Sequence, residues 1–427
     1  MLAYIAPRIA NVSLRFLAMG CKFALVIALA RFLTPAEVGL YGLFAATVGF
    51  SVLMVGGDYY TYSQRELLSR RREDWAFVLQ HQAIATLTLY LVLLPAQALI
   101  FWLDLMPVHL AAWFFLLLVV EHIAQEINRL LVAMQRPLLA SLVLFIRMGL
   151  WVWFLLPWMW LKTSARTLES VFEAWFIGCT LALALGGVII WREARPWKWN
   201  KLDTAWLKRG FGVALMFLMA TVCFKALQTV DRYVVQNLAG ADFLGVYVVY
   251  SAMAGGVLSV LDPAVFSFLY PPMVSAFRQG DHATYARLIR ELAYSAVGLS
   301  VLVAGAIGLL APYVFEWTSR PIYAEHLPVL WILLCMTVVY AAGMVPHYAL
   351  YAQGGDKIIV LAHVSSLLVF GVVVAVLANL TPLAATAYAL LAAFLWMGAV
   401  KYFCYRRLSR RQQKLDGASF KQEPVSV

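Results

Sequence analysis

Long apolar runs follow one another along nearly the whole chain, and each ends at charged residues, a proline or a polar cluster. A helix that crosses a bilayer needs about 20 mostly apolar residues, and twelve runs have about that length. The predicted spans lie at roughly 11–33, 40–63, 75–102, 110–132, 138–161, 171–191, 210–232, 243–270, 288–315, 326–350, 358–379 and 383–405. The pattern therefore predicts an all-α, polytopic membrane protein with about twelve transmembrane helices.

The composition supports this prediction and narrows the class of protein. Of the 427 residues, 63 % are apolar and 13 % are charged, and the mean hydropathy is +0.80. These values exclude a water-soluble globule, a disordered chain and a disulfide scaffold. The five cysteines lie in or beside apolar runs without CxxC spacing, so we expect no disulfide, metal site or cofactor. The loops are short and contain no GxxxxGK[ST] motif, so we expect no soluble ATPase domain.

The formal net charge of +11 carries information about topology. In membrane proteins, Lys and Arg collect in the cytoplasmic loops. The first terminus, the even-numbered loops and the tail hold 24 of the 33 Lys and Arg residues, and the odd-numbered loops hold five. This asymmetry places both termini in the cytoplasm, and we expect no nucleic-acid partner. Arg15 and Lys22 interrupt the first apolar run, which therefore resembles a retained span more than a signal peptide.

A short motif occurs once in each half of the chain. Leu33–Tyr41 and Leu238–Tyr247 both read L-[TA]-[PG]-A-[ED]-x-G-[LV]-Y when one gap is allowed, and Asp58 and Asp262 recur at a similar offset. An even number of spans in each half gives both copies the same orientation, related by an axis along the membrane normal. This predicts two pseudo-symmetric six-helix bundles. The expected organisation is an N-terminal lobe at 1–191, a cytoplasmic linker at 192–209, a C-terminal lobe at 210–405 and a basic cytoplasmic tail at 406–427.

The segment Leu29–Tyr41, LARFLTPAEVGLY, carries a family resemblance. It is similar to the L-x-R-x-L-[ST]-P-x-[ED]-x-G-x-Y junction of Wzx-type polysaccharide flippases, which belong to the multidrug/oligosaccharidyl-lipid/polysaccharide exporter superfamily. The copy in the second half and the twelve-span plan extend the resemblance over nearly the whole chain. It implies a MATE-like fold, with two six-helix lobes that open alternately to either face, and a cationic cavity in the branch that moves lipid-linked glycans.

Cations deep within the predicted spans are the candidate substrate-binding residues, because each costs about 2.5–3.5 kcal/mol at mid-span. Lys22 lies about 16 Å into the first span, with Arg15 on the same helix face, and Arg147 lies about 14 Å into the fifth. Lys225 occupies the outer half of the seventh span. Together they would form an electropositive path whose natural cargo is an anion such as a lipid pyrophosphate. Structural roles stay open, namely snorkelling of Arg15 to the interface and interhelical ion pairs of the two lysines.

Carboxylates near the spans are the candidates for ion coupling. Glu121 and Glu126 lie with Arg129 in the fourth span, and Asp58 lies in the second span, close to the cytoplasmic surface. A buried carboxylate can exchange a proton as the lobes switch. The alternatives are a Glu–Arg network that locks the fourth span, and a cap or surface pair at Asp58.

Two further features have less definite interpretations. Trp and Lys alternate in the linker at 197–201, which suits a segment at the level of the lipid headgroups or an ordinary solvated linker. His347 and His363 flank the loop between the tenth and eleventh spans, and Lys401 lies at the end of the last span. The sequence assigns these three residues no role.

The leading hypothesis is a non-enzymatic flippase in the bacterial inner membrane. It would move an undecaprenyl-pyrophosphate-linked glycan, such as an O-antigen unit of lipopolysaccharide, from the cytoplasmic to the periplasmic leaflet by alternating access. Its expected partners are the lipid bilayer and a glycan polymerase of the same pathway. A drug or cation antiporter of the same fold is one alternative and should place unpaired carboxylates at the centre of the cavity. An integral-membrane glycan polymerase or ligase is the other and should have a sizeable periplasmic loop.

Overall fold

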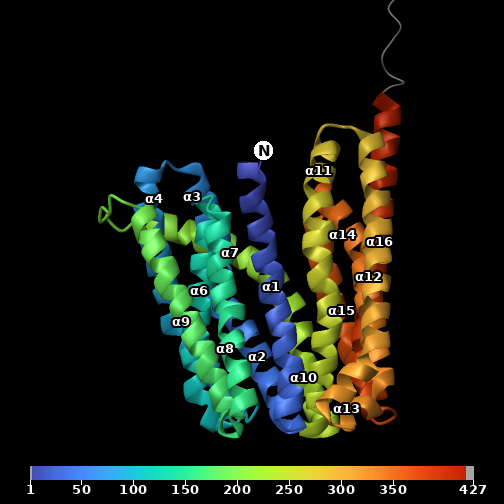
Figure 1. Cartoon of the computed structure of the whole chain (residues 1–427). Helices are drawn as coiled ribbons and strands as arrows, with labels where there is room; N and C mark the ends of the chain where they lie inside the picture. Colours follow the sequence, from blue (N-terminus) through green and yellow to red (C-terminus); the bar gives the residue numbers. More distant parts are fainter. Residues whose placement is uncertain (1, 420–427) are drawn as a thin grey trace, which may run out of the picture. The chain divides into compact units, whose positions relative to one another are not determined.

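The structure is a computed structural model that describes residues 2–419, without the side chains of residues 2–9, 216, 217, 219, 220 and 411–419. The Arg8 side chain and the end of the predicted basic tail lie outside the described residues. All regular elements in the described part are helical, which confirms the predicted all-α class (Figure 1).

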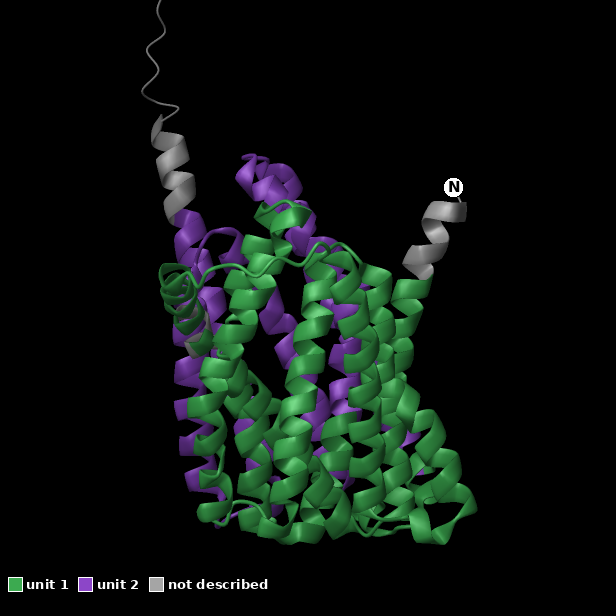
Figure 2. Cartoon of the chain, turned by 90° about the vertical axis from the view of Figure 1, so that its left-hand side faces the viewer, with its two compact units in different colours: residues 1–252, 313–325 green, residues 253–312, 326–427 purple. Residues whose placement is uncertain are grey.

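The chain divides into two compact units (Figure 2). Unit 1 comprises Met1–Ala252 and Tyr313–Glu325, and unit 2 comprises Met253–Pro312 and His326–Val427. The six-helix lobes that the sequence repeat predicts at 1–191 and 210–405 remain a prediction.

Unit 1 contains the first ten helices in chain order. They are α1 (Leu2–Phe32), α2 (Pro35–Gly56), α3 (Tyr60–Ser69), α4 (Trp75–Gln97), α5 (Leu99–Trp102), α6 (Ala111–Ala133), α7 (Pro137–Phe145), α8 (Trp151–Leu161), α9 (Leu168–Glu193) and most of α10 (Thr204–Leu261). The short helices η1 (Arg72–Asp74), η2 (Val108–Leu110) and η4 (Thr163–Ala165) lie between them, and a π-helical turn, η3 (Ile146–Leu150), joins α7 to α8. Unit 1 also includes the short helix α13 (Ile322–Glu325).

Unit 2 contains the remaining helices. They are η5 (Asp262–Phe266), α11 (Ser267–Arg278), most of α12 (His282–Thr318), α14 (Leu327–Ala352), α15 (Asp356–Leu377) and α16 (Pro382–Ser419). Both α14 and α15 pack against α16.

The number of spans agrees with the prediction once one long segment is divided. In the described residues, eleven helical segments are long and apolar enough to cross a membrane, and one of them, Thr221–Arg278, has 58 residues. Within it, α10 is interrupted at Gly240, which has φ 84° and ψ 177°. A glycine adopts this conformation at little cost because it has no Cβ. The seventh and eighth predicted spans are the two parts of this segment.

The second span starts earlier and ends earlier than the predicted range 40–63. A capping box starts α2 at Pro35, because the Glu37 amide donates to Thr34 Oγ1 at 3.3 Å and the Thr34 amide donates to Glu37 Oε2 at 2.8 Å. The helix ends at Gly56, where Gly57 and Asp58 have φ 55° and 52°. The sequence did not indicate this end because aromatic residues, Tyr59, Tyr60 and Tyr62, follow it.

The two copies of the repeated motif pack against each other within unit 1. A Cβ built on Gly39 would lie 2.8 Å from the carbonyl oxygen of Ala241, and one built on Gly245 would overlap the carbonyl oxygen of Pro35. These glycines occupy the same position in the two copies, so each faces the turn of the other. The close approach of α2 and α10 explains why both copies carry glycine here.

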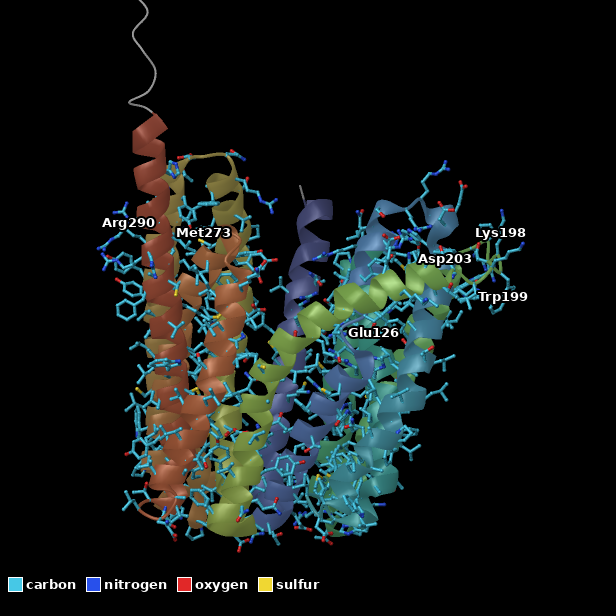
Figure 3. All side chains as sticks on the ribbon, turned by 180° about the vertical axis from the view of Figure 1, so that it is seen from behind. Glu126, Lys198, Trp199, Asp203, Met273 and Arg290 are labelled. Carbon is cyan, nitrogen blue, oxygen red and sulfur yellow. The ribbon has the colours of Figure 1, made fainter. Side chains whose placement is uncertain are left out.

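The linker after α9 lies against α3 and α4 of unit 1. Asn200 and the Gln80 side chain exchange two hydrogen bonds, of 2.8 and 2.9 Å. The buried Trp206 donates to Glu66 Oε2 at 3.0 Å. At the tip of the linker, Lys198 and Trp199 point away from the helices, and Trp199 is 92 % exposed (Figure 3).

Candidate functional site

Arg147 forms an ion pair inside unit 1. It lies in the π-helical turn η3, a local distortion that is frequent at functional sites. Its Nη1 lies 3.4 Å from Glu121 Oε1 on α6, and both side chains are largely buried. The Nε atom of Arg147 has no hydrogen-bond partner in the described part of the chain. The guanidinium therefore keeps a donor that is not satisfied by the protein.

The Glu121 carboxylate is held in place from a third helix. Its Oε2 accepts hydrogen bonds from Trp175 Nε1 at 3.2 Å and from Cys179 Sγ at 2.9 Å, both on α9. Donors of this kind stabilise the ionised form of a carboxylate. Glu121 was a candidate for ion coupling, and the structure places it beside the cations as the counter-ion of Arg147.

Lys22 joins this pair from α1. Its ammonium interacts electrostatically with both Glu121 and Arg147, yet the residue is exposed. The backbones of α1 and η3 approach closely one turn before it, where a Cβ on Gly149 would lie 3.2 Å from Ala18 Cα. An exposed ammonium within a membrane-spanning helix needs water or an anion beside it, because hydrocarbon cannot solvate a charge.

Lys225 extends the cationic group from α10. It is exposed, its Nζ lies 3.4 Å from Gln228 Oε1, and it interacts electrostatically with Lys22 and Arg232. Arg232 pairs with Asp231 at 3.1 Å, whose other oxygen accepts from Tyr247. Arg232 therefore has its own counter-ion.

Arg15 lies apart from the other three cations. Its Nε donates to Ser141 Oγ on α7 at 3.0 Å, and the Ser141 hydroxyl donates to Asn11 Oδ1. Lys22 follows Arg15 by seven residues, and this separation corresponds to about 10 Å along the helix axis. Both side chains face the continuous segment formed by α7 and η3, as their spacing in the sequence suggested.

We call Lys22, Glu121, Arg147 and Lys225 the cationic cluster. It contains three cations and one carboxylate, and thus an excess of positive charge. The depth of these three cations in the predicted spans grouped them with Arg15 as candidates, but it did not indicate their relation to Glu121. No sequence pattern connects α6 with α9, so the roles of Trp175 and Cys179 could not be foreseen.

Glu126 belongs to a separate polar network. Its Oε1 accepts from Arg129 Nη1 at 2.6 Å, and its Oε2 accepts from Gln82 Nε2 on α4 at 2.7 Å. His122 Nε2 lies 3.9 Å from Glu126 Oε1, and its Nδ1 is 2.6 Å from the Tyr90 hydroxyl. The Glu–Arg pair that the sequence suggested for the fourth span is thus present, with Glu126 as its acid.

Asp58 lies next to this network at the end of α2. It is only 3 % exposed, forms a hydrogen bond with the Thr221 side chain and interacts electrostatically with Arg129 and Glu126. Burial raises the pKa of the Asp58 carboxyl above its usual value, and the hydrogen bond and Arg129 oppose this effect in part. Asp58 and Glu126 therefore form a pair of buried carboxyl groups that share one arginine. In the described residues, no group of three or more His, Cys, Asp or Glu side chains is arranged to hold a metal ion.

Comparison with known proteins shows the fold of the chain. No family model and no curated protein matches the sequence. An inward-facing multidrug resistance MATE family transporter of the MOP superfamily matches with a TM-score of 0.71 and 16 % identity, covering 95 % of this chain and 99 % of that one. An outward-facing transporter of the same description matches with a TM-score of 0.55 and 15 % identity, covering 96 % of this chain and 97 % of that one. A MATE crystal structure in the bent conformation matches with a TM-score of 0.56 and 14 % identity, over 96 % of this chain and 97 % of that one. The chain therefore has the MATE-like fold of these MOP superfamily transporters.

Proposed function

We propose that this chain is a non-enzymatic membrane transporter that moves a lipid-linked anion between the leaflets of a bilayer. Its substrate is an undecaprenyl-pyrophosphate-linked glycan, and the direction is from the cytoplasmic to the periplasmic leaflet of the bacterial inner membrane. Both termini lie in the cytoplasm, as the distribution of Lys and Arg indicates. A polymerase that consumes the transferred glycan is its expected partner.

The excess positive charge of the cationic cluster is the observation that supports this substrate. Lys22 and Lys225 are exposed within membrane-spanning helices, and neither forms an ion pair in the described part of the chain. Two cations and a pyrophosphate would neutralise each other where the bilayer offers no other counter-ion. A neutral or cationic substrate would leave this charge uncompensated.

The cations have different roles in this proposal. Lys22 and Lys225 contact the pyrophosphate directly because they are exposed point charges with mobile side chains. Arg147 is buried and contributes its positive charge from the protein side, while Glu121 keeps the guanidinium in place. Arg15, nearer the cytoplasmic end of α1, attracts the headgroup before it reaches the cluster.

The test is transfer of a fluorescent undecaprenyl-pyrophosphate-linked oligosaccharide in proteoliposomes, followed by quenching from outside with dithionite. Lys22→Gln and Lys225→Gln each remove one charge-assisted contact, which is worth about 1.5–3 kcal/mol, or at least about tenfold in apparent affinity. We expect the double variant to abolish transfer. The matched control is the pair Lys162→Gln and Lys208→Gln, two exposed lysines outside the cluster. Transfer by the cluster variant at the rate of the control would refute the assignment.

A drug or cation antiporter is the second candidate, and the buried carboxyl groups of Asp58 and Glu126 favour it. Such groups can exchange a proton for a cationic substrate. Glu126 is paired with Arg129, however, which lowers the negative charge available to a cation. Efflux of a cationic dye that is lost in Glu126→Gln and unaffected by the two lysine variants would favour the antiporter. In the flippase, the same carboxyl groups are the candidates for proton coupling.

A further inference from the structure

Three basic side chains meet inside unit 2. Lys401 on α16 is 1 % exposed, and its Nζ lies 3.2 Å from His363 Nε2 on α15. The ring of His363 stacks on that of His347 on α14, with centroids 6.2 Å apart and an interplanar angle of 11°. The three residues come from three different spans, and we call them the basic triad. The sequence had placed Lys401 at the end of the last span, but that span continues to Arg410 and encloses it.

Close helix packing encloses the basic triad. A Cβ on Gly343 would lie 3.4 Å from Gly398 Cα, so α14 and α16 approach closely about one turn before His347 and Lys401. The Nδ1 atom of His347 is buried without a hydrogen-bond partner. A site this tight favours a ligand that needs almost no volume.

The charged and titratable groups nearby offer Lys401 no counter-ion. The helices α14 and α15 pack against α16 and contribute His347 and His363, with Tyr348 beside His347. Tyr285 on α12 interacts electrostatically with Tyr405 on α16. On α15, Asp356 lies seven residues before His363, which is about 10 Å along the axis. Asp262 interacts electrostatically with Tyr340 and Tyr348 on α14. In the described part of the chain, no ion pair joins Lys401 to a carboxylate.

The contact between Lys401 and His363 can hold either a charged or a neutral pair. In the charged pair an ammonium donates to a neutral imidazole, and in the neutral pair one of the two nitrogens donates an N–H to the other. The first arrangement places one positive charge in the triad and the second places none. Uptake of one proton converts the second into the first, adds one charge and breaks no covalent bond. A buried charge without a counter-ion is costly, so the charged triad favours exposure of the site to water more strongly than the neutral triad does.

We propose that the basic triad is a proton-binding site, and that uptake and release of one proton there drives transport. The proton binds at Lys401 Nζ and is shared with His363, while the stacked His347 ring provides a second base. The charged triad favours a conformation in which water reaches it, and the neutral triad favours the enclosed one described above. This site is distinct from Asp58 and Glu126, which lie in unit 1. The coupling to transport depends on the proposed function, but proton binding does not.

The first experiment tests proton binding on the reconstituted protein without any substrate. Nuclear magnetic resonance of the histidine ring nitrogens, labelled with nitrogen-15, follows each ring between about pH 5 and pH 9. We expect a titrating ring signal that disappears in His363→Gln, shifts in Lys401→Met and persists in His109→Gln, a variant of an exposed histidine in unit 1. The proposal is overturned if the His363 signal of the wild-type protein does not change with pH. Because this measurement uses the wild-type protein, it holds even where a variant fails to fold.

The second experiment tests coupling, with fluorescent undecaprenyl-pyrophosphate-linked oligosaccharide in proteoliposomes under an imposed pH gradient. The pH gradient sets the largest ratio of probe concentration that transport can maintain between the two leaflets. If one proton fewer is carried per cycle, this ratio falls by about tenfold at a gradient of about one pH unit. We expect this loss in Lys401→Met. Lys357→Met, which alters an exposed lysine on α15, should keep the wild-type ratio. If Lys401→Met reaches the wild-type ratio, the proposed coupling is wrong. If the wild-type protein does not move the probe at all, the proposed function is wrong, and the first experiment still decides whether the triad binds a proton.

Discussion

The contact between the two copies of the repeated motif leads to a prediction about Gly39. An alanine there would place its Cβ 2.8 Å from the carbonyl oxygen of Ala241 and 2.9 Å from the amide nitrogen of Gly245. Carbon and carbonyl oxygen normally approach no closer than about 3.3 Å, so the helices must separate by about 0.5 Å. Both nearby atoms belong to the backbone, and no side-chain rotation can relieve the contact.

A matched variant on the same helix isolates the energetic cost. Gly49 also lies on α2, and a Cβ there would meet nothing within 4 Å. Both alanines gain up to about 1 kcal/mol of helix propensity, and only Gly39→Ala pays for overpacking, typically about 1–3 kcal/mol. We therefore expect Gly39→Ala to be less stable than Gly49→Ala by about 1–3 kcal/mol. Gly245→Ala should resemble Gly39→Ala, because its Cβ would overlap the carbonyl oxygen of Pro35.

Thermal unfolding of the purified protein in detergent measures this difference. A change of one kcal/mol shifts the midpoint by about 2–4 °C in domains of roughly 150–250 residues. Gly39→Ala should unfold a few degrees below Gly49→Ala, which should match or exceed the wild-type protein. Equal midpoints for the two variants would show that α2 and α10 do not approach as closely as described, and the explanation of the repeated glycines would be wrong.

Two further predictions concern the carboxyl groups of unit 1. Glu121→Gln leaves the buried Arg147 without its counter-ion, so we expect the free energy of unfolding to fall by about 3–5 kcal/mol. The double variant Glu121→Gln with Arg147→Met also removes the buried charge, and it should largely restore the free energy of unfolding. A double variant that is no more stable than the single one would contradict this. Burial raises the pKa of the Asp58 carboxyl in the folded state, so its stabilising contribution is complete below the unfolded pKa and is lost as the pH rises through the folded pKa. Asp58→Asn should therefore gain stability relative to the wild-type protein as the pH rises from the unfolded to the folded pKa of Asp58. Thermal midpoints measured across a pH series would refute this if the curves of the two proteins stay parallel.

The sequence predicts best those features that depend on local pattern. Apolar runs give the spans, and Lys22 and Lys225 attract attention because hydrocarbon cannot solvate them. The topology drawn from the distribution of Lys and Arg stays a prediction. The capping box at Thr34 and Glu37 also follows from neighbouring residues. Each of these inferences needs only the chain within a few turns of the residue in question.

Features that depend on packing between distant helices could not be predicted. Glu121 and Arg147 lie on different helices, and the ion pair depends on how α6 packs beside η3. The sequence positions of His363 and Lys401 differ by 38, a separation with no meaning for helical periodicity. Their contact exists because α15 and α16 pack side by side, which also explains why the sequence left both residues without a role.

The two glutamates of α6 face different sides of the helix and contact different partners. Glu121 and Glu126 are five residues apart, which is about 7.5 Å along the axis and about 140° around it. Glu121 therefore faces Arg147 and α9, whereas Glu126 faces Gln82 on α4 and pairs with Arg129. Sequence analysis grouped both as coupling candidates because it had only their residue type and depth. With the partners known, Glu121 is the counter-ion within the cationic cluster, whereas Glu126 stays a candidate for exchange of a second proton, separate from the one at the basic triad. Protonation of Glu126 then changes the charge beside Arg129 and Asp58 without removing the counter-ion of Arg147, so substrate can remain bound while the proton moves.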